Sequence, residues 1–298
     1  MNRTISVVIP TIGRPVLGRA IESVLAQTVQ PHEILVMADT IESIEVPNNP
    51  RIKLLRVGPG AGGNVARQAG VEAARGELVA LLDDDDEWYP YHLENQLALI
   101  PAEAHQNHDW IATSRLHARY LNGKTEVWPK RLKSDTETLP QYIFRKHSVF
   151  GGVGFIQAST LLFPKELGLS VPFDQRLKFH QDVAWLVDLA NREEDISVYQ
   201  AHAPSVVYHI GSLTVSKKIT AGQSIAWANR LDPGDLRTLG DFIVVHAIQS
   251  AKNTGSVKHM LKTILTGLKL GRPGVPAIVY SLLLVARVAA LRLLGRKA

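Results

Sequence analysis

Apolar positions in the first hundred residues follow two alternating patterns, one typical of strands and one typical of helices. After Pro15, and again over residues 66–73, apolar or small residues return at helical spacing, and Gly76 is placed to end the second helix. Short apolar runs typical of buried strands lie at residues 5–9, 33–37, 52–57 and 78–82. Strands that alternate with helices predict parallel pairing and an α/β sandwich.

The pattern is less regular after residue 100. A helix is predicted to begin near His180, and the last part of the chain reads as helices with a break at residues 271–276. Further strands are predicted at residues 109–114, 155–163 and 206–208. These features predict one α/β domain over residues 1–215, followed by a helical C-terminal extension over residues 216–298.

Length and composition indicate the size of the core and the cellular compartment of the protein. The chain has 298 residues, of which 45% are apolar and 20% charged, so it is long and apolar enough to bury a sizeable core. It contains no cysteine, which excludes a disulfide framework and thiolate zinc sites and fits a reducing compartment. The apolar run before Pro10 is too short for a secretory signal, so we expect a cytoplasmic protein.

Charge is distributed unevenly along the chain. The formal net charge is +5, yet the residues from 251 onward contain nine Lys or Arg and neither Asp nor Glu. The rest of the chain is therefore net acidic. A basic, apolar tail on an acidic globule suggests that the tail alone meets a surface. The high pI by itself gives no reason to expect a nucleic acid partner.

The tail combines this charge with an amphipathic pattern. Lys258, Lys262 and Lys269 fall in one narrow helical sector, beside an apolar stripe. The uninterrupted apolar stretch at 277–286 is too short to span a bilayer and is followed by Arg287. We expect an interfacial helix on the inner face of the cell membrane, drawn to anionic lipid. A helix packed on the protein's own surface or in a dimer is the alternative.

An acidic run follows the fourth predicted strand, in the sequence VALLDDDDEWYP at residues 79–90. In open α/β sheets, ligands bind beyond the carboxyl ends of the strands, and Asp39 follows another such end. Carboxylates suit Mg²⁺ or Mn²⁺, which usually takes one or two of them and completes its shell with water and phosphates. Either alternate pair of the run, Asp83 with Asp85 or Asp84 with Asp86, has the spacing for this. The alternative is a solvated turn in which one Asp caps the next helix.

A glycine-rich loop offers a competing interpretation. Residues 58–63, GPGAGG, match G-x-G-x-x-G, follow a predicted strand and open a helix, which resembles a dinucleotide-binding fingerprint. The fingerprint belongs on the first strand of its unit, whereas this is the third strand. Glu77 also begins the next strand, where it is badly placed for a ribose contact. A nicotinamide-dependent oxidoreductase therefore stays open as an alternative, while a loop that lets phosphate or sugar approach the backbone is favoured.

Taken together, these stretches resemble family 2 glycosyltransferases of the GT-A type. The resemblance covers about residues 4–215 and rests on four segments of the sequence: SVVIPTIGRPVLGRAIESVLAQT, HEILVMADT, GGNVARQAGVEAARGELVALLDDDDEWYPYHLENQL and KFHQDVAWLVDL. It implies a Rossmann-like α/β/α sandwich with a mostly parallel mixed sheet. It also implies a donor half at about residues 1–115 and an acceptor half at about residues 116–215.

The resemblance implies roles for particular residues. On the donor side, it places the nucleotide base against Asp39 and Arg67, above the turn at Pro10 and Thr11, and it places the ribose near Asp84. Asp83 and Asp85 would hold the metal and the diphosphate, and a late histidine that reaches the metal in some relatives would be His209. The catalytic base would be Asp182, although a helix N-cap explains an Asp at that position equally simply.

The implied activity is an inverting, metal-dependent transfer of a sugar from a nucleoside diphosphate, of the UDP or dTDP type, to a glycan or a lipid-linked acceptor. The expected setting is polysaccharide biosynthesis at the cell surface. Three positions depart from the family pattern: Gln181 replaces a common Glu, Ala38 replaces the first Asp of a usual pair, and Ile12 replaces a common aromatic residue. Ala38 and Gln181 keep open a non-catalytic nucleotide-sugar-binding protein.

Overall fold

The computed structural model describes residues 3–211, 219–254 and 256–294. The chain divides into two compact units. Unit 1 comprises Met1–Pro129 and Ile156–Leu213, and unit 2 comprises Lys130–Phe155 and Thr214–Ala298. The segment at 130–155, which the sequence assigned to the acceptor half of the α/β domain, therefore belongs to the same unit as the C-terminal helices.

Unit 1 is built on a mixed sheet of nine strands. Its order is β3-β2-β1-β4-β8-β6-β9-β5, and β7 pairs with β6. The strands are β1 (Ile5–Thr11), β2 (Glu33–Ala38), β3 (Ile52–Arg56), β4 (Leu78–Leu81), β5 (Glu87–Trp88), β6 (Trp110–Tyr120), β7 (Thr125–Trp128), β8 (Leu162–Pro164) and β9 (Ser197–Ile210). The first four pair in parallel, as do β6 and β9, whereas β8 runs antiparallel to both its neighbours. The predicted mostly parallel mixed sheet is confirmed.

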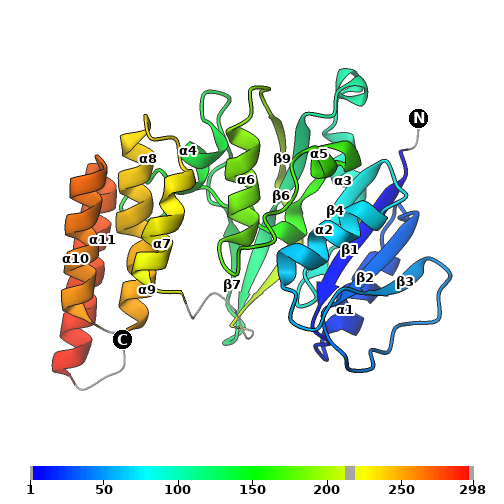
Figure 1. The fold of residues 1–298 in the computed structure, drawn as a ribbon, viewed down its shortest axis with the longest axis horizontal. Helices are drawn as coiled ribbons and strands as arrows, with labels where there is room; N and C mark the ends of the chain where they lie inside the picture. The colour runs from blue at the N-terminus through cyan, green and yellow to red at the C-terminus, as the bar shows by residue number, and fades with distance from the viewer. Residues whose placement is uncertain (1–2, 212–218, 255, 295–298) are drawn as a thin grey trace. The chain divides into compact units, whose positions relative to one another are not determined.

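Helices cover the sheet of unit 1, and Figure 1 shows α2 beside the blue strand β1, where it packs on β1 and β2. The helices are α1 (Leu17–Leu25), α2 (Gly63–Ala73), α3 (His92–Ala98), α5 (Lys165–Ser170) and α6 (Gln181–Ala190), with short 3₁₀ turns at Ala102–Gln106 and Ala158–Thr160. Every residue of β2 and β4 is buried, as the continuous apolar runs predicted. The core of the unit lies between these strands and the apolar faces of the helices.

Parallel pairing brings the carboxyl ends of three strands to one edge of the sheet. In the register of β1, Thr11 lies opposite Ala38 of β2, and Val8 lies opposite Leu81 of β4. The chain that leaves these strands is therefore brought together at one place, although its segments are far apart in sequence. This is the edge at which α/β sheets bind ligands.

The strand expected at residues 155–163 is only partly present. Residues 158–160 form a 3₁₀ turn, and the strand that follows, β8, has three residues. The polar side chains explain the difference, because buried Gln157 and Ser159 turn toward the acidic run instead of pairing in a sheet. In contrast, β9 is much longer than the strand predicted at 206–208 and pairs with β6 over most of its length.

Unit 2 is helical. Its helices are α4 (Leu139–Phe144), α7 (Ala221–Trp227), α8 (Leu236–Asp241), α9 (Ile248–Asn253), α10 (Val257–Leu270) and α11 (Val275–Leu293), with a 3₁₀ turn at Ala228–Arg230 and a π-helical stretch at Phe242–Ala247. Phe144 of α4 packs edge-on against Phe242 and Trp227, which joins the 130–155 segment to the later helices. The predicted break lies between α10 and α11. Part of the tail, residues 295–298, lies outside the described residues.

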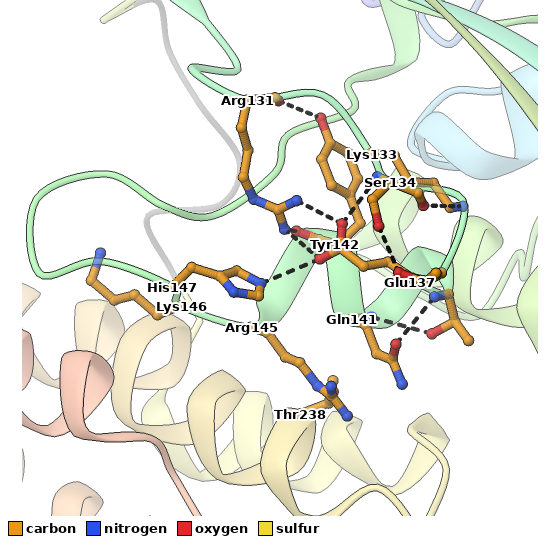
Figure 2. Close-up of polar contacts among 12 residues, drawn as sticks. Arg131, Lys133, Ser134, Glu137, Gln141, Tyr142, Arg145, Lys146, His147 and Thr238 are labelled. Carbon is orange, nitrogen blue, oxygen red and sulfur yellow. Dashed lines mark hydrogen bonds and ion pairs between the residues drawn. The ribbon is translucent and has the colours of Figure 1, made fainter.

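Polar contacts fix the 130–155 segment within unit 2, as Figure 2 shows. Arg131 forms two hydrogen bonds to the carboxylate of Glu137, which also faces His147. Arg145 donates to the hydroxyl of Thr238 and pairs with Asp235 at the start of α8. Arg145 thus holds the segment to α8, while Arg131 and His147 brace the segment itself.

Candidate active site at the carboxyl ends of the sheet

The acidic run leaves β4 at the ligand-binding edge, and each aspartate has its own environment. Asp83 accepts a hydrogen bond from Arg67 Nη2 at 2.6 Å and another from Gln157 Nε2 at 3.0 Å. Its side chain keeps 25% of its surface exposed. Asp83 is thus anchored by α2 on one side and by the 157–159 turn on the other, yet stays open to solvent.

Asp84 and Asp85 share an arginine that the sequence did not single out. Arg14 Nη1 lies 2.9 Å from Asp84 Oδ1 and 2.7 Å from Asp85 Oδ2. The hydroxyl of Thr11 donates to Asp84 Oδ2 at 2.5 Å, so the end of β1 does meet the acidic run. Burial raises the pKa of Asp84 to about 6, and the neighbouring carboxylates add to the rise while Thr11 and Arg14 oppose it.

Asp86 is buried and makes its hydrogen bonds inside the protein. Its side chain is fully buried and accepts hydrogen bonds from the Ser159 hydroxyl at 2.6 Å, from Gln157 Nε2 at 2.9 Å and from the His209 backbone at 3.2 Å. Burial raises its pKa well above the usual value, and Asp83 raises it further. The alternate pair of Asp84 and Asp86 is therefore badly placed to hold an ion, because one member faces the core. Asp83 and Asp85 are the better pair.

The glycine loop folds around the carboxylate of Asp39. The two oxygens of Asp39 accept hydrogen bonds from the backbone N–H groups of Ala61 and Gly62, each at 2.7 Å. A Cβ at Gly58 would stand 1.6 Å from Asp39 Oδ1, so only glycine fits there. The loop amides that a dinucleotide phosphate would need are thus occupied by an internal carboxylate. This contact of Asp39 with Ala61 and Gly62 counts against the nicotinamide alternative.

Arg67 links the acidic run to the segment that carries the expected base. It lies on α2, is largely buried, and donates from Nη1 to Gln181 Oε1 at 3.2 Å as well as to Asp83. Burial alone would lower its pKa, but the charges of Asp83 and Asp182 raise it. Arg67 is therefore a permanent positive charge among carboxylates that come from two distant parts of the sequence.

Asp182 lies in the first turn of α6, close to Arg67 and Asp83. Burial raises its pKa, and Asp83 raises it too, while Arg67 opposes the rise. The backbone N–H of Val183, its own neighbour, donates to Asp182 Oδ1 at 3.0 Å. The residue at the cap position is His180, whose left-handed conformation, with φ at 52°, is uncommon outside glycine. Asp182 is therefore no simple N-cap, and the residue with strained backbone, His180, lies two positions before it.

His209 is close to the run but is paired with another carboxylate. Its Nε2 lies 2.7 Å from Glu87 Oε1. While Nε2 stays with Glu87, His209 could bind a metal only through its other ring nitrogen, Nδ1. Among the described residues, no group of three or more His, Asp or Glu side chains is arranged to hold an ion.

The donor set of Asp83 and Asp85 still fits Mg²⁺ or Mn²⁺. Both side chains are partly exposed, at 25% and 16%, and both offer hard oxygen ligands. An ion of this class takes one or two carboxylates and draws its other ligands from water and phosphate. Each carboxylate is paired with an arginine in this structure, Asp83 with Arg67 and Asp85 with Arg14, so an ion would compete with these cations for the oxygens.

Four residues of this site were missed or undervalued in the sequence: Arg14, Gln157, Ser159 and Tyr208. Burial and the carboxylates of the run and of Asp182 all raise the pKa of Tyr208, which places its phenol among them. Arg14 lies within a family-like segment and was the detectable one. Gln157 and Ser159 lay in a stretch interpreted as a strand, and no local signal distinguishes a polar residue that binds an acidic run from one at a strand edge.

The fold defines the class of protein. A crystal structure of S. aureus TarS, residues 1–349, superposes with a TM-score of 0.53 at 14% sequence identity and covers 98% of this chain and 92% of the TarS chain. TarS structures in complex with UDP and with UDP-GlcNAc match with TM-scores of 0.51 and 0.53. The fold is GT-A-like, with a mixed, mostly parallel sheet followed by C-terminal helices.

The sequence then gives the family. The model of glycosyl transferase family 2 matches residues 6–167, which is more than half of the chain. The chain belongs to this family. The expected resemblance and fold class are both confirmed.

Several curated relatives are similar over part of the chain. The amylovoran biosynthesis glycosyltransferase AmsB of Erwinia amylovora is 32% identical over 39% of this chain and 37% of its own length. The putative colanic acid biosynthesis glycosyl transferase WcaA of Escherichia coli (strain K12) is 29% identical over 64% of this chain and 72% of its own. The succinoglycan biosynthesis protein ExoO of Rhizobium meliloti (strain 1021) is 31% identical over 55% and 49%. The chain thus spans about a third of AmsB and half of ExoO.

Proposed function

We propose that this protein transfers a sugar from a nucleoside diphosphate, of the UDP or dTDP type, to a hydroxyl group of a glycan or lipid-linked acceptor. One observation carries the proposal. Arg67 joins the acidic run at the end of β4 to the Asp182 segment, which lies nearly a hundred residues further along the chain. A site with two sets of carboxylates around a buried arginine suits a reaction in which a diphosphate leaves and a proton is taken.

The donor would lie along the carboxyl ends of β1, β2 and β4. In this proposal Thr11 and Pro10 lie beneath the base, Asp39 and Arg67 contact it, and Asp84 meets the ribose. The contact of Thr11 with Asp84 supports a single continuous surface for nucleoside and ribose. Ile12, which is 57% exposed, would offer an apolar side chain near the base where many relatives stack an aromatic ring. The TarS complexes with UDP and UDP-GlcNAc favour a donor of the same class.

Asp83 and Asp85 would hold Mg²⁺ or Mn²⁺ together with the diphosphate. When bound, the ion would supply Lewis-acid stabilisation of the charge that grows on the departing diphosphate. Arg14 and Arg67 already face these carboxylates, so they would lie close to the same phosphates. The chain's own residues thus provide two permanent cations for the leaving group.

Asp182 would take the proton from the acceptor hydroxyl. The bond from the anomeric carbon to the diphosphate oxygen breaks, the bond to the acceptor oxygen forms, and the acceptor proton passes to the Asp182 carboxylate. Attack from the face opposite the leaving group inverts the anomeric centre. The charge of Arg67 would keep Asp182 ionised despite its burial, which a base requires.

The setting of the reaction would be polysaccharide biosynthesis at the cytoplasmic face of the membrane. The names of AmsB, WcaA and ExoO all refer to the synthesis of such polymers. A lipid-linked acceptor would explain why a basic, apolar helical tail follows the α/β unit. A non-catalytic nucleotide-sugar-binding protein is the second candidate, because Gln181 stands where many relatives have a carboxylate.

Isothermal titration tests the donor assignment. UDP, dTDP, GDP and NAD would each be titrated into the whole protein with Mn²⁺ and with EDTA. We expect one nucleoside diphosphate to bind in a metal-dependent way, and we expect Asp85→Ala to weaken it at least tenfold. The matched control is Asp109→Ala, which removes a partly exposed aspartate at the opposite, amino end of β6. Binding of NAD with no diphosphate binding would overturn the proposal.

A further inference from the structure

The outward face of α11 is apolar over the whole length of the helix. Its exposed apolar residues recur at helical spacing, and they are Val275, Val279, Leu282, Leu283, Ala286, Ala290 and Leu293, while Arg287 and Arg292 are the exposed cations of the helix. Val275 is 73% exposed, Leu282 and Leu283 are 48% and 49% exposed, and Leu293 is 90% exposed. A helix on the surface of a water-soluble domain normally turns its polar side outward. This one does the reverse.

The inward face of α11 is already occupied. Ser281, Val285 and Val288 are buried, and the latter two belong to an apolar cluster with Met260 and Ile264 of α10. Tyr280, at the flank, bonds through its hydroxyl to Gln249 of α9. The helix is therefore packed along its length against other helices of unit 2, and its exposed stripe is left without a protein partner in the described chain.

Helix α10 packs against α11 and exposes apolar side chains of its own. Its buried residues are Met260, Thr263, Ile264 and Gly267, while Leu261, Leu265 and Leu268 are exposed beside them, with Leu265 at 66%. Most of the large apolar side chains that are exposed in the described chain lie on α10 and α11. Such an apolar patch marks a surface that meets a partner or a membrane.

Cations border this apolar surface. Lys258, Lys262 and Lys269 are exposed in the sector of α10 next to its leucines, and Arg287 lies at one edge of the α11 stripe. The sequence from residue 251 onward contains neither Asp nor Glu. An apolar face bordered only by positive charge complements the anionic headgroups and acyl chains of a bilayer. A protein partner would need an apolar face bordered by acids.

We propose that the exposed faces of α10 and α11 form a membrane-binding surface that lies in the plane of an anionic bilayer. By length and composition α11 would also suffice to cross a membrane, with a mean hydropathy of 1.7. Packing of its inner face against α10 and the earlier helices favours the in-plane arrangement, because a crossing would pull that face away from its cluster. This surface would hold the enzyme at the membrane, where the proposed function takes place. Membrane binding itself does not depend on the proposed function, and only its biological role rests on it.

Vesicle sedimentation of the whole protein tests the binding. Vesicles of phosphatidylcholine alone would be compared with vesicles that contain about a third phosphatidylglycerol, at low and high salt. We expect binding to the anionic vesicles, and a loss of the charge-dependent part as salt shortens the Debye length from about 10 Å to about 3 Å. Equal, weak partitioning to both kinds of vesicle would overturn the proposal.

Two variants and a control assign the surface. The double variant Leu282→Glu/Leu283→Glu is expected to lower vesicle binding at least tenfold. Lys262→Gln is expected to lower binding to anionic vesicles about fivefold and to leave binding to neutral vesicles unchanged. The control is Leu169→Glu on α5 of unit 1, where the leucine is 46% exposed and so matches Leu282 and Leu283. It should bind as the unchanged protein does.

A depth measurement separates an in-plane helix from a crossing one. The chain has no cysteine, so single substitutions such as Val279→Cys, Leu283→Cys and Ala290→Cys give unique sites for a fluorescent label. Quenching by lipids with spin labels at known depths should place all three at one shallow level. Depths that run from one leaflet to the other along the helix would overturn the in-plane arrangement.

The other candidate partner for the exposed face of α11 is a second copy of this chain, and dimerisation would give a different experimental result. If α11 pairs two copies, the double glutamate variant would turn a dimer into a monomer in light scattering, and vesicle binding would be absent before and after. That outcome would overturn the proposal. Nucleotide binding in solution is measured separately, so its failure would count against the transferase and leave the membrane surface standing.

Discussion

Asp182 is the residue whose removal discriminates best between catalysis and binding. Asp182→Asn keeps the size of the side chain but removes its basicity, so we expect turnover to fall about 10² to 10⁴-fold while nucleotide binding stays unchanged. The matched control is Asp188→Asn on the same helix, which should leave turnover unaffected. Both variants would be assayed for transfer and for titration of the nucleoside diphosphate. Unchanged turnover in Asp182→Asn would remove the base assignment.

The pH dependence of turnover follows from the environment of Asp182. Burial raises its pKa, and Asp83 adds to the rise, so the group gains its proton at a higher pH than an ordinary carboxyl does. A base works only when ionised, so turnover should fall as pH drops through this raised value. The acid limb of the profile of kcat should therefore lie above about pH 4, the usual range of an aspartate. A limb at or below the usual carboxyl value would show that another group sets it.

Asp235 gives a stability prediction with a defined sign. Burial would raise its pKa, but hydrogen bonds from Thr238 and the charge of Arg145 lower it overall. A lowered carboxyl pKa stabilises the fold above the unfolded value of about 4, and this stability is lost as pH falls through the lower, folded value. We expect Asp235→Ala, which also removes the cap of α8, to cost about 1 to 2 kcal/mol at pH 7. Asp235→Asn keeps the cap and should cost less.

The measurement for Asp235 is urea unfolding of the whole protein, followed through unit 2, at pH 7 and at about pH 3. The difference between the unchanged protein and Asp235→Asn should shrink at the lower pH, since the ion pair with Arg145 is then weakened in the unchanged protein and already absent in the variant. A difference that grows toward low pH would contradict the expected sign.

At this scale the sequence predicted the acids better than their partners. Asp83, Asp84, Asp85 and Arg67 lie at one edge of the sheet, and the place of the acidic run could be predicted because periodicity located the end of the strand before it. Arg14 was not identified, because its place in a family-like segment was the one signal it gave and nothing local shows which carboxylates an arginine reaches. Asp86 could not be distinguished from its neighbours, and only the turn at 157–159 buries it. Contacts made across seventy residues have no short-range signal.

At the scale of elements, a helix and a strand approach closely through one glycine. Gly70 on α2 faces Val8 on β1, and a Cβ on Gly70 would stand 2.3 Å from Val8 Cγ1. Gly70→Ala should therefore destabilise the fold by about 1 to 3 kcal/mol through overpacking. The control is Gly18→Ala in α1, where no atom lies within 4 Å of the added Cβ. That substitution should be stabilising by about 0.5 to 1 kcal/mol.

A second substitution identifies the cause of the Gly70 effect. If the added methyl group clashes with Val8, then Val8→Ala should recover part of the loss in the Gly70→Ala background, although it destabilises the protein on its own. The measurement is urea unfolding of the four proteins of this cycle. Simple additivity of the two substitutions would show that the contact is not the reason.

Helices and strands were predicted well where the apolar periodicity was clear. They were predicted less well where polar residues of the candidate site interrupt that periodicity. The continuous runs of β1, β2 and β4 needed no other information, since a fully buried strand has few alternatives. The segment at 155–163 differs from the predicted strand because its buried polar residues form hydrogen bonds to the acidic run. β9 is longer than predicted because pairing with β6 supports a strand through polar positions such as Gln200 and His202. Tertiary pairing overrides local pattern in such places.

At the scale of the whole molecule, the class of the sheet could be inferred from the sequence, but the unit to which residues 130–155 belong could not. The first half of the chain follows the α/β rules closely, and its sheet was predicted with the correct class. The segment at 130–155 joins the later helices through Phe144 and Arg145, while Arg131 braces the segment itself. Its sequence is polar and basic and contains a single short helix, so no pattern indicated which unit it completes.

The two proposed surfaces, one for the donor and one for the membrane, together make a prediction about acceptors. An enzyme held in the plane of a bilayer meets a lipid-linked acceptor at a high local concentration, whereas a water-soluble acceptor gains nothing from membrane binding. We therefore expect Leu282→Glu/Leu283→Glu to keep kcat/KM for a soluble acceptor analogue and to lose at least tenfold for the same glycan on a lipid in anionic vesicles. Leu169→Glu should change neither value. An equal fall in kcat/KM with both acceptors would mean that α11 supports the fold of the enzyme. An unchanged kcat/KM for the lipid-linked glycan in vesicles would show that the surface has no part in catalysis.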